Sequence, residues 1–265
     1  MKHRLSSEFI YQLFALLLAV IVVHAIYVGV IRPSADAQIQ REMALQAAGG
    51  DFVPERSFAV VIRDFEQEAC FILLLWALAI MGYKARCTLR EQELLQRRLL
   101  EIPEGTSVLP QDAREYSRSL EALPEPEQDL LLPRTLLSAL QRFATTGSIQ
   151  AVSDTIKESC EVESERLDSE LSMVRYIAWA IPSIGFIGTV RGIGDALGQA
   201  YKAVEGDISG VTVSLGVAFN STFVALVLSI IIMFCLHQLQ LSQERLVLDC
   251  QRYADQRLLR HLVAH

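Results

Sequence analysis

The chain has 265 residues, of which 51% are hydrophobic, and its mean hydropathy is +0.30. The apolar residues occur in long blocks, which argues against an ordinary soluble globular protein. The formal net charge is −7, and most of it lies in segment 84–174, which has 11 basic and 17 acidic residues. An acidic chain lacks the basic face that binding to nucleic acid requires, so nucleic acid is not expected as a partner.

Four apolar segments predict an all-α membrane protein with four transmembrane helices. The first lies in segment 1–32, whose apolar run from 9 to 31 is long enough to cross a bilayer, because a helix rises about 1.5 Å per residue. The second, 67–83, is the shortest and needs its flanking residues to complete the span. The third and fourth spans are expected at 175–200 and 211–236.

The segments between the spans differ in length and charge. Lysines and arginines concentrate before the first span, in segment 84–174 and in segment 237–265, which the positive-inside rule places in the cytoplasm together with both termini. Segment 33–66 is then a polar outer segment with no folded domain, and 201–210 is a short outer turn. A cleaved signal peptide is an alternative for the start, but its apolar part would have only about 7–15 residues.

The cytoplasmic segment is expected to be helical but broken. Five of the chain's eight prolines lie between 103 and 133, so no single helix crosses this stretch. A short helix is predicted near 111–122, and another over 133–146, ended by Gly147. From Ser148 onward one helix of about 50 residues is predicted to run into the third span, since neighbouring helices in a membrane tolerate a proline such as Pro182. Segment 237–265 is expected to continue the fourth span as a cytoplasmic helix.

The third and fourth spans have the composition of closely packed helices. Small residues one turn apart let helix backbones touch in lipid, and a two-helix hairpin cannot bury both of its faces on itself. This predicts that several copies form a ring. The predicted packing residues are Gly185, Gly188, Gly192, Gly194 and Gly198 with Pro182 on the third span, and Ser214, Ala218 and Ala225 on the fourth.

Polar residues at membrane depth are the candidate functional residues. Thr189, Asn220, Ser221 and Thr222 either bond to carbonyls of their own helix or form a polar, water-accessible seam. Arg191 and Asp195 are four residues apart and share one helix face, so they can form an ion pair. That pair either fixes helix geometry at the outer rim or acts electrostatically at the outer mouth of a pore.

No other chemistry is indicated. The five cysteines lack the spacing of metal ligands and are expected to be free thiols. No phosphate-binding loop, nucleophile elbow or cluster of His, Cys and carboxylate residues is found, so an enzyme, a cofactor and a metal are not expected.

The third span "IPSIGFIGTVRGIGDALGQA" resembles that of the MotA/TolQ/ExbB ion-channel family. Segment 219–229 (FNSTFVALVLS) is similar to the family's next span, at Ser221, Thr222 and Ala225. The resemblance covers about 149–240, and the rest of the chain only by topology. Two positions depart from the TolQ and ExbB pattern: Arg191 replaces a Trp, and Val217 replaces a Glu. Four spans with an internal N-terminus are similar to MotA instead.

The resemblance implies a homopentamer in the bacterial inner membrane, surrounding a dimer of a single-span MotB/TolR/ExbD-like protein with an intramembrane Asp. It also implies that Thr189 and Thr222 lie on the ion path and that ion-motive force is converted into mechanical work. The transported ion, proton or sodium, is left open, as is the driven process, which includes flagellar rotation, outer-membrane transport, envelope maintenance and gliding. A non-conducting scaffold with the same packing motifs is the alternative.

Overall fold

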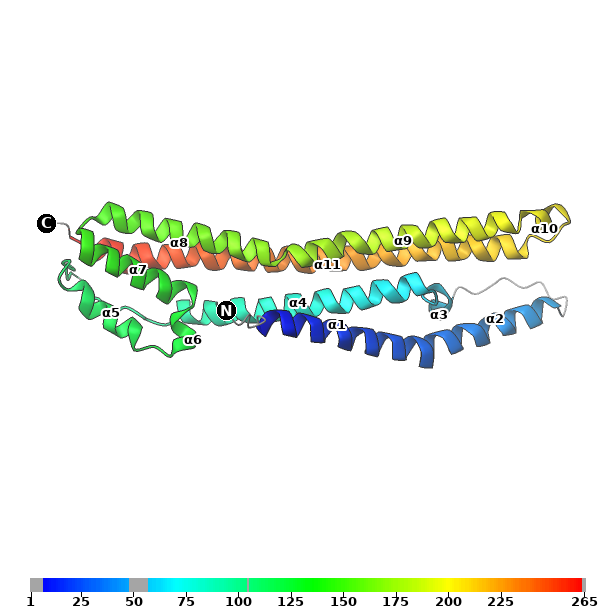
Figure 1. The fold of residues 1–265 in the computed structure, drawn as a ribbon, viewed down its shortest axis with the longest axis horizontal. Coiled ribbons are helices and arrows are strands. Elements are labelled where there is room, and N and C mark those ends of the chain that lie inside the picture. Colours follow the sequence, from blue (N-terminus) through cyan, green and yellow to red (C-terminus); the bar gives the residue numbers. More distant parts are fainter. Residues whose placement is uncertain (1–6, 48–56, 104, 264–265) are drawn as a thin grey trace, which may run out of the picture. The chain divides into compact units, whose positions relative to one another are not determined.

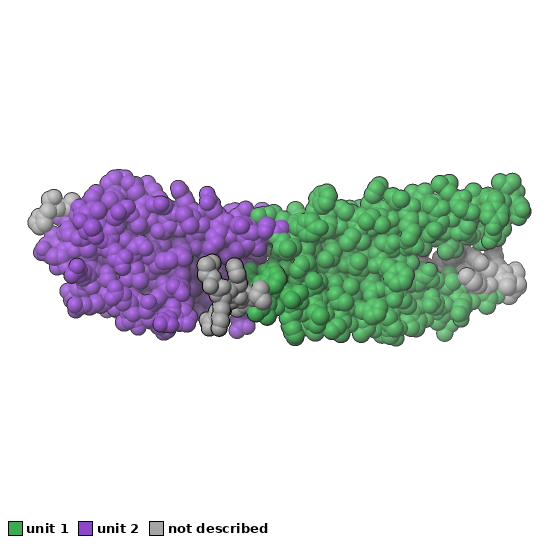
Figure 2. Space-filling view, in the orientation of Figure 1, with its two compact units in different colours: residues 1–82, 173–236 green, residues 83–172, 237–265 purple. Residues whose placement is uncertain are grey.

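The computed structural model describes residues 7–47, 57–103 and 105–263, and these form helices joined by short connections (Figure 1). Within them the β-structure consists of one isolated bridge, between Val108 and Leu262. The all-α class is therefore confirmed. Two compact units are present, one of residues 1–82 and 173–236 and the other of residues 83–172 and 237–265 (Figure 2).

Four helices are long and apolar enough to cross a membrane, as predicted. They are Glu8–Glu42, Phe65–Leu95, Ile149–Gly198 and Ser209–His261. Each is longer than the apolar segment that predicted it, because good helix formers continue the helix past the apolar residues at one end or both.

The first unit contains the apolar parts of all four. Its elements are α1 (Ser7–Ile26), the π-helix η1 (Tyr27–Ile31), α2 (Arg32–Ala47), α3 (Phe58–Val61), the first part of α4 (Phe65–Leu95), α9 (Ser172–Gly198), α10 (Ala200–Val204) and the first part of α11 (Ser209–Arg257). Helix α4 contacts α1, where Trp76 Nε1 donates to Gln12 O at 2.9 Å. It also contacts α9, where the Cys70 thiol donates to Ile181 O at 3.7 Å.

The outer segment is more helical than the sequence indicated. Helix α2 continues the first span without a break to Ala47, inside the predicted polar segment 33–66. Its residues are mostly strong helix formers, and the segment's polarity masked that propensity. The part from 48 to 56 lies outside the described residues. The predicted turn at 201–210 contains α10, which Gly206 ends with φ of 100° and a bond from Asp207 N to Lys202 O.

The second unit has a core of its own. It comprises the rest of α4, α5 (Ala113–Glu121), α6 (Glu125–Gln128), α7 (Leu131–Thr146), α8 (Ile149–Glu170), the rest of α11 and the 3₁₀ helix η2 (Leu259–His261). The largest fully buried side chains of this core belong to Leu120, Leu131, Leu136, Leu140, Phe143 and Ile156. Buried aliphatic and aromatic surface of this kind is the main favourable term in folding.

The boundary between α7 and α8 follows the capping residues, as predicted. Gly147 ends α7 in the left-handed conformation with φ of 62°, and its amide donates to Phe143 O. The Ser148 hydroxyl accepts a hydrogen bond of 3.3 Å from Ala151 N and so caps α8.

Replacing Ser148 by alanine is expected to lower the free energy of unfolding by about 1 kcal/mol, because an amide at the start of α8 loses its acceptor. Thermal unfolding of the purified protein in detergent measures the effect. Ser153→Ala, inside the same helix, is the matched control and should leave the midpoint unchanged or raise it slightly.

The predicted long helix has the expected length, from Ile149 to Gly198, but it is interrupted once. Helices α8 and α9 meet at Leu171, whose amide donates to Asp168 O at 3.2 Å, three residues back instead of four. No glycine or proline marks this position in the sequence, so the pattern did not reveal it. Pro182 lies inside α9 without ending it, as predicted.

Candidate functional site

Glycines on α9 pack directly against α11. A Cβ added to Gly185 would lie 2.4 Å from Ala225 Cβ, one on Gly188 would lie 2.5 Å from Ser221 Cβ, and one on Gly192 would lie 2.7 Å from Ala218 N. Side chains do not approach so closely, so only glycine fits these positions. We call this contact the glycine seam; its members are Gly185, Gly188 and Gly192 on α9 with Ser214, Ala218, Ser221 and Ala225 on α11.

Two of the five predicted packing glycines lie outside the seam. An added Cβ at Gly194 or Gly198 would meet nothing within 4 Å. Residues 185, 188 and 192 share one face of a helix, whereas 194 and 198 project on the other side. Within one chain these two glycines therefore make no contact with α11.

The two threonines singled out by sequence come together beside the seam. The hydroxyls of Thr189 and Thr222 are hydrogen-bonded to each other. The Thr189 hydroxyl also lies 3.0 Å from Ala218 O on α11, and that of Thr222 lies 3.2 Å from Gly185 O on α9. Both hydroxyls thus bridge the helices and do not bond solely within their own.

The other two polar candidates behave differently. Ser221 is buried in the seam and donates to Val217 O in its own helix at 3.0 Å, which is the packing alternative raised from sequence. Asn220 is half-buried and lies two positions before Thr222, on the side of α11 away from the seam. The structure therefore places Thr189, Thr222 and Ser221 at the contact between α9 and α11, and Asn220 away from it.

Arg191 has a closer partner than Asp195. Its Nε and Nη2 donate to the two carboxylate oxygens of Glu66, at the start of α4, at 2.7 and 2.9 Å. Asp195 lies 3.7 Å from Nη1 and is more exposed than Glu66. The predicted pair with Asp195 is present, but the two-point bond to Glu66 is the stronger contact.

Sequence reasoning did not identify Glu66, because it was placed in the polar outer segment. Its neighbour Gln67 is also buried, with Nε2 3.1 Å from Val61 O and 3.5 Å from Ser221 Oγ. The Gln67 Oε1 atom is buried without a hydrogen-bond partner among the described residues. Burial raises the pKa of Asp64, just before α4, while Arg63 and Arg191 oppose that shift.

Comparison with known proteins identifies the region that contains this site. Residues 127–252 match the MotA/TolQ/ExbB proton channel family. The chain carries a domain of this family. The MotA/TolQ/ExbB match begins before the resemblance seen at 149–240 and includes all of α7, α8, α9 and α10 and nearly all of α11. No curated protein and no solved structure matches the chain.

The resemblance inferred from sequence is therefore confirmed for the part of the chain that contains the glycine seam and both threonines. Helix α1 and the first part of α4, with Glu66 and Gln67, lie before the matched region. With four apolar helices, the MotA/TolQ/ExbB domain indicates a multi-pass membrane protein.

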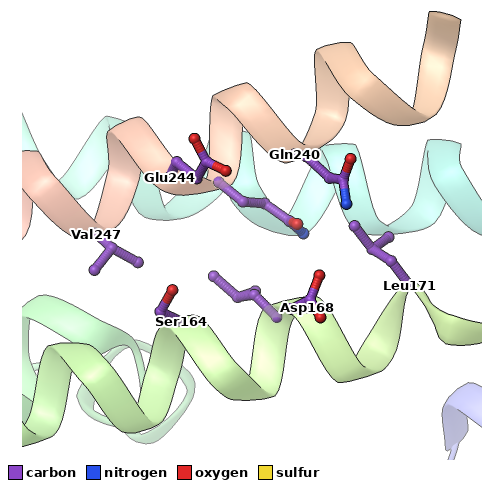
Figure 3. A pocket seen from close by; sticks show the side chains of 8 residues that line it. Ser164, Asp168, Leu171, Gln240, Glu244 and Val247 are labelled. Carbon is purple, nitrogen blue, oxygen red and sulfur yellow. The ribbon is translucent and has the colours of Figure 1, made fainter.

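A shallow cavity of about 200 Å³ lies in the second unit between α8 and α11 (Figure 3). Its polar lining residues are Ser164, Asp168, Gln240, Gln243 and Glu244. Gln243 is buried, and its Nε2 atom has no hydrogen-bond partner among the described residues. Among the described residues, no group of three or more His, Cys, Asp and Glu side chains is placed so that it could hold a metal ion.

Proposed function

We propose that this chain is the multi-span subunit of an ion-driven complex in the bacterial inner membrane, with both termini in the cytoplasm. Copies of the chain form a pentamer around a dimer of a single-span MotB/TolR/ExbD-like partner. Protons flow along the threonine-bearing side of the glycine seam and drive movement of the ring relative to the dimer. An electrical potential supplies about 2.3 kcal/mol per charge per 100 mV, which is several times the thermal energy.

The observation that carries this proposal is the hydroxyl pair of Thr189 and Thr222. Both lie in the matched family region and link α9 to α11 beside the glycine seam. Hydroxyl groups both donate and accept, so they can pass a proton or a water-borne cation without trapping it.

The carboxylate that binds the ion is expected to come from the partner. Helix α11 has no charged residue from Ser209 to Leu236, and the one acidic residue in α9 is Asp195, near its end. An intramembrane Asp on a central partner helix supplies the missing group. This chain alone is then expected to conduct poorly.

The exposed surface beside the threonines favours a further helix there. Phe186 and Ile193 on α9, with Phe219 and Phe223 on α11, are 40% exposed or more in the single chain. Large apolar side chains of this kind become buried against lipid, against another copy or against a partner helix. A ring that encloses a partner dimer covers this surface while leaving the hydroxyls next to it.

The test replaces each threonine by valine, which keeps the shape and removes the hydroxyl. The tagged chain is purified with its native partner and reconstituted into liposomes, and proton flux under an imposed potential is followed with a pH dye. Thr189→Val and Thr222→Val are each expected to lower the flux at least about tenfold, equivalent to about 1.4 kcal/mol of barrier. Co-purification of the partner should be unchanged.

Ser229→Ala is the matched control. The Ser229 hydroxyl also bridges the two helices, donating to Ala178 O at 3.1 Å, but it lies about two turns from Thr222. It should retain the flux of the unaltered protein. If the unaltered complex assembles but carries no proton flux, the non-conducting scaffold is the correct function; if the valine variants conduct normally, the threonines are not on the path.

A further inference from the structure

A second polar cluster lies between α1 and α4, where the first span changes its winding. The π-helix Tyr27–Ile31 separates His24 from Arg32. A π-turn inside an α-helix is rare and is often found at functional sites. Both flanking residues contact the same carboxylate, that of Glu68 on α4. We call His24, Tyr27, Arg32 and Glu68 the α1–α4 cluster.

Glu68 holds both partners at once. His24 Nδ1 lies 2.7 Å from Glu68 Oε1, and the Arg32 guanidinium donates to Oε2. The Glu68 side chain is only 9% exposed. The guanidinium is also stacked near the Phe65 ring, 4.4 Å from its centroid. Arg32 thus occupies one carboxylate oxygen and leaves the other for His24.

This arrangement determines which ring nitrogen of His24 can gain a proton. A carboxylate paired with a guanidinium accepts hydrogen bonds and does not donate them, so His24 Nδ1 carries the hydrogen between the two groups. In the neutral ring Nε2 then has a free lone pair. The bond to Glu68 is made by Nδ1, so a proton at Nε2 would leave it intact, and the His24 side chain is 60% exposed in the single chain.

We propose that His24, oriented by Glu68, is a proton-binding site of this chain. A proton at Nε2 makes the His24 ring positive, so its bond to the Glu68 carboxylate becomes an ion pair and gains the attraction between opposite charges. A lower pH therefore strengthens the contact between α1 and α4, and a higher pH weakens it. Histidine is suited to the role because its charge ordinarily changes between about pH 5 and 8.

Further polar and charged groups lie close to the cluster. Tyr27 is 1% exposed and lies among Glu68, Cys70, Arg32 and Asp64; its hydroxyl has no partner within the described residues. Arg63 pairs with Asp36 at 3.5 Å and with Asp64 at 4.0 Å. Arg63 and Asp64 lie just before α4, and Asp36 lies on α2.

This site is independent of the proposed ion path. It uses neither Thr189 nor Thr222 and lies before the matched family region. Its test measures the contact between α1 and α4 instead of ion flux. The two ideas can therefore fail separately.

The test uses Trp76, which lies about two turns along α4 from Glu68. Its indole donates to Gln12 O of α1, so its emission reports on how α1 packs against α4. Of the chain's two tryptophans the other, Trp179, is 72% exposed, and Trp179→Phe leaves a single reporter. Emission of the purified complex in lipid nanodiscs is recorded from about pH 8 to about pH 5, the range in which histidine titrates. One step in Trp76 emission is expected on acidification.

Two substitutions of His24 should act in opposite directions. His24→Gln keeps a donor for Glu68 but cannot gain charge, so emission should stay at its alkaline value. His24→Lys carries a permanent charge and should hold the acidic value throughout. His237→Gln, on α11, is the matched control and should titrate like the unaltered protein. An emission step that persists in both His24 variants, or that is absent from the unaltered protein, would overturn the proposal.

Discussion

Replacing Gly192 by valine is expected to separate α9 from α11 and to cost about 3 kcal/mol of unfolding free energy. An added Cβ would lie 2.7 Å from Ala218 N, 2.8 Å from Ala218 Cβ and 2.8 Å from Ser214 O. Two of these atoms belong to the backbone of α11, which cannot rotate away as a side chain can. The helices must therefore move apart, which also breaks the hydrogen bonds of Thr189 to α11.

Thermal unfolding in detergent, read by circular dichroism, measures this effect. Gly194→Val is the matched control, because Gly194 lies two residues along the same helix and an added Cβ meets nothing within 4 Å. Both variants carry the same propensity cost of valine in a helix, so the difference between them reports the seam alone. If Gly192→Val and Gly194→Val unfold at the same temperature, the helices do not touch at Gly192.

The second large effect is expected at the ion pair between α4 and α9. Glu66→Gln should destabilise the protein by about 2 kcal/mol, because the Arg191 guanidinium loses both charged acceptors at membrane depth. The expected loss of unfolding free energy is smaller than for a fully buried pair, because the Arg191 side chain is 42% exposed. Asp195→Asn should cost less than about 0.5 kcal/mol, since that carboxylate is 3.7 Å away and mostly exposed.

A double-mutant cycle separates the pair from its surroundings. Glu66→Gln and Arg191→Met are made singly and together, and unfolding is followed in detergent. The double variant is expected to be more stable than the sum of the single effects predicts, because neither group is then left without its partner. Purely additive effects would contradict a direct bond between Glu66 and Arg191.

Several features of the fold could be predicted because they depend on residues close in the chain. Runs of apolar residues predicted four spans, and the structure has four helices of that length and composition. Gly147 and Ser148 predicted the end of one helix and the start of the next, since capping acts within one turn. The glycine and threonine pattern of the third span also predicted the family.

The candidate site could be predicted only in part. Thr189 and Thr222 were identified by resemblance, but their mutual hydrogen bond depends on how α9 and α11 are rotated against each other. The same rotation places Gly192 in the seam and leaves Gly194 outside it. Both glycines belong to the same kind of motif, so spacing alone could not distinguish them.

The sequence by itself determined the helical class, the number of apolar helices, the caps of α7 and α8 and the family of residues 127–252. Each of these depends on composition or on neighbours within a few residues. Only the tertiary structure decided that Arg191 bonds to Glu66, 125 residues away, and that His24 and Arg32 share Glu68. Such contacts are set by the rotation and vertical register of packed helices, which depend on the summed fit of many side chains and leave no local pattern in the sequence.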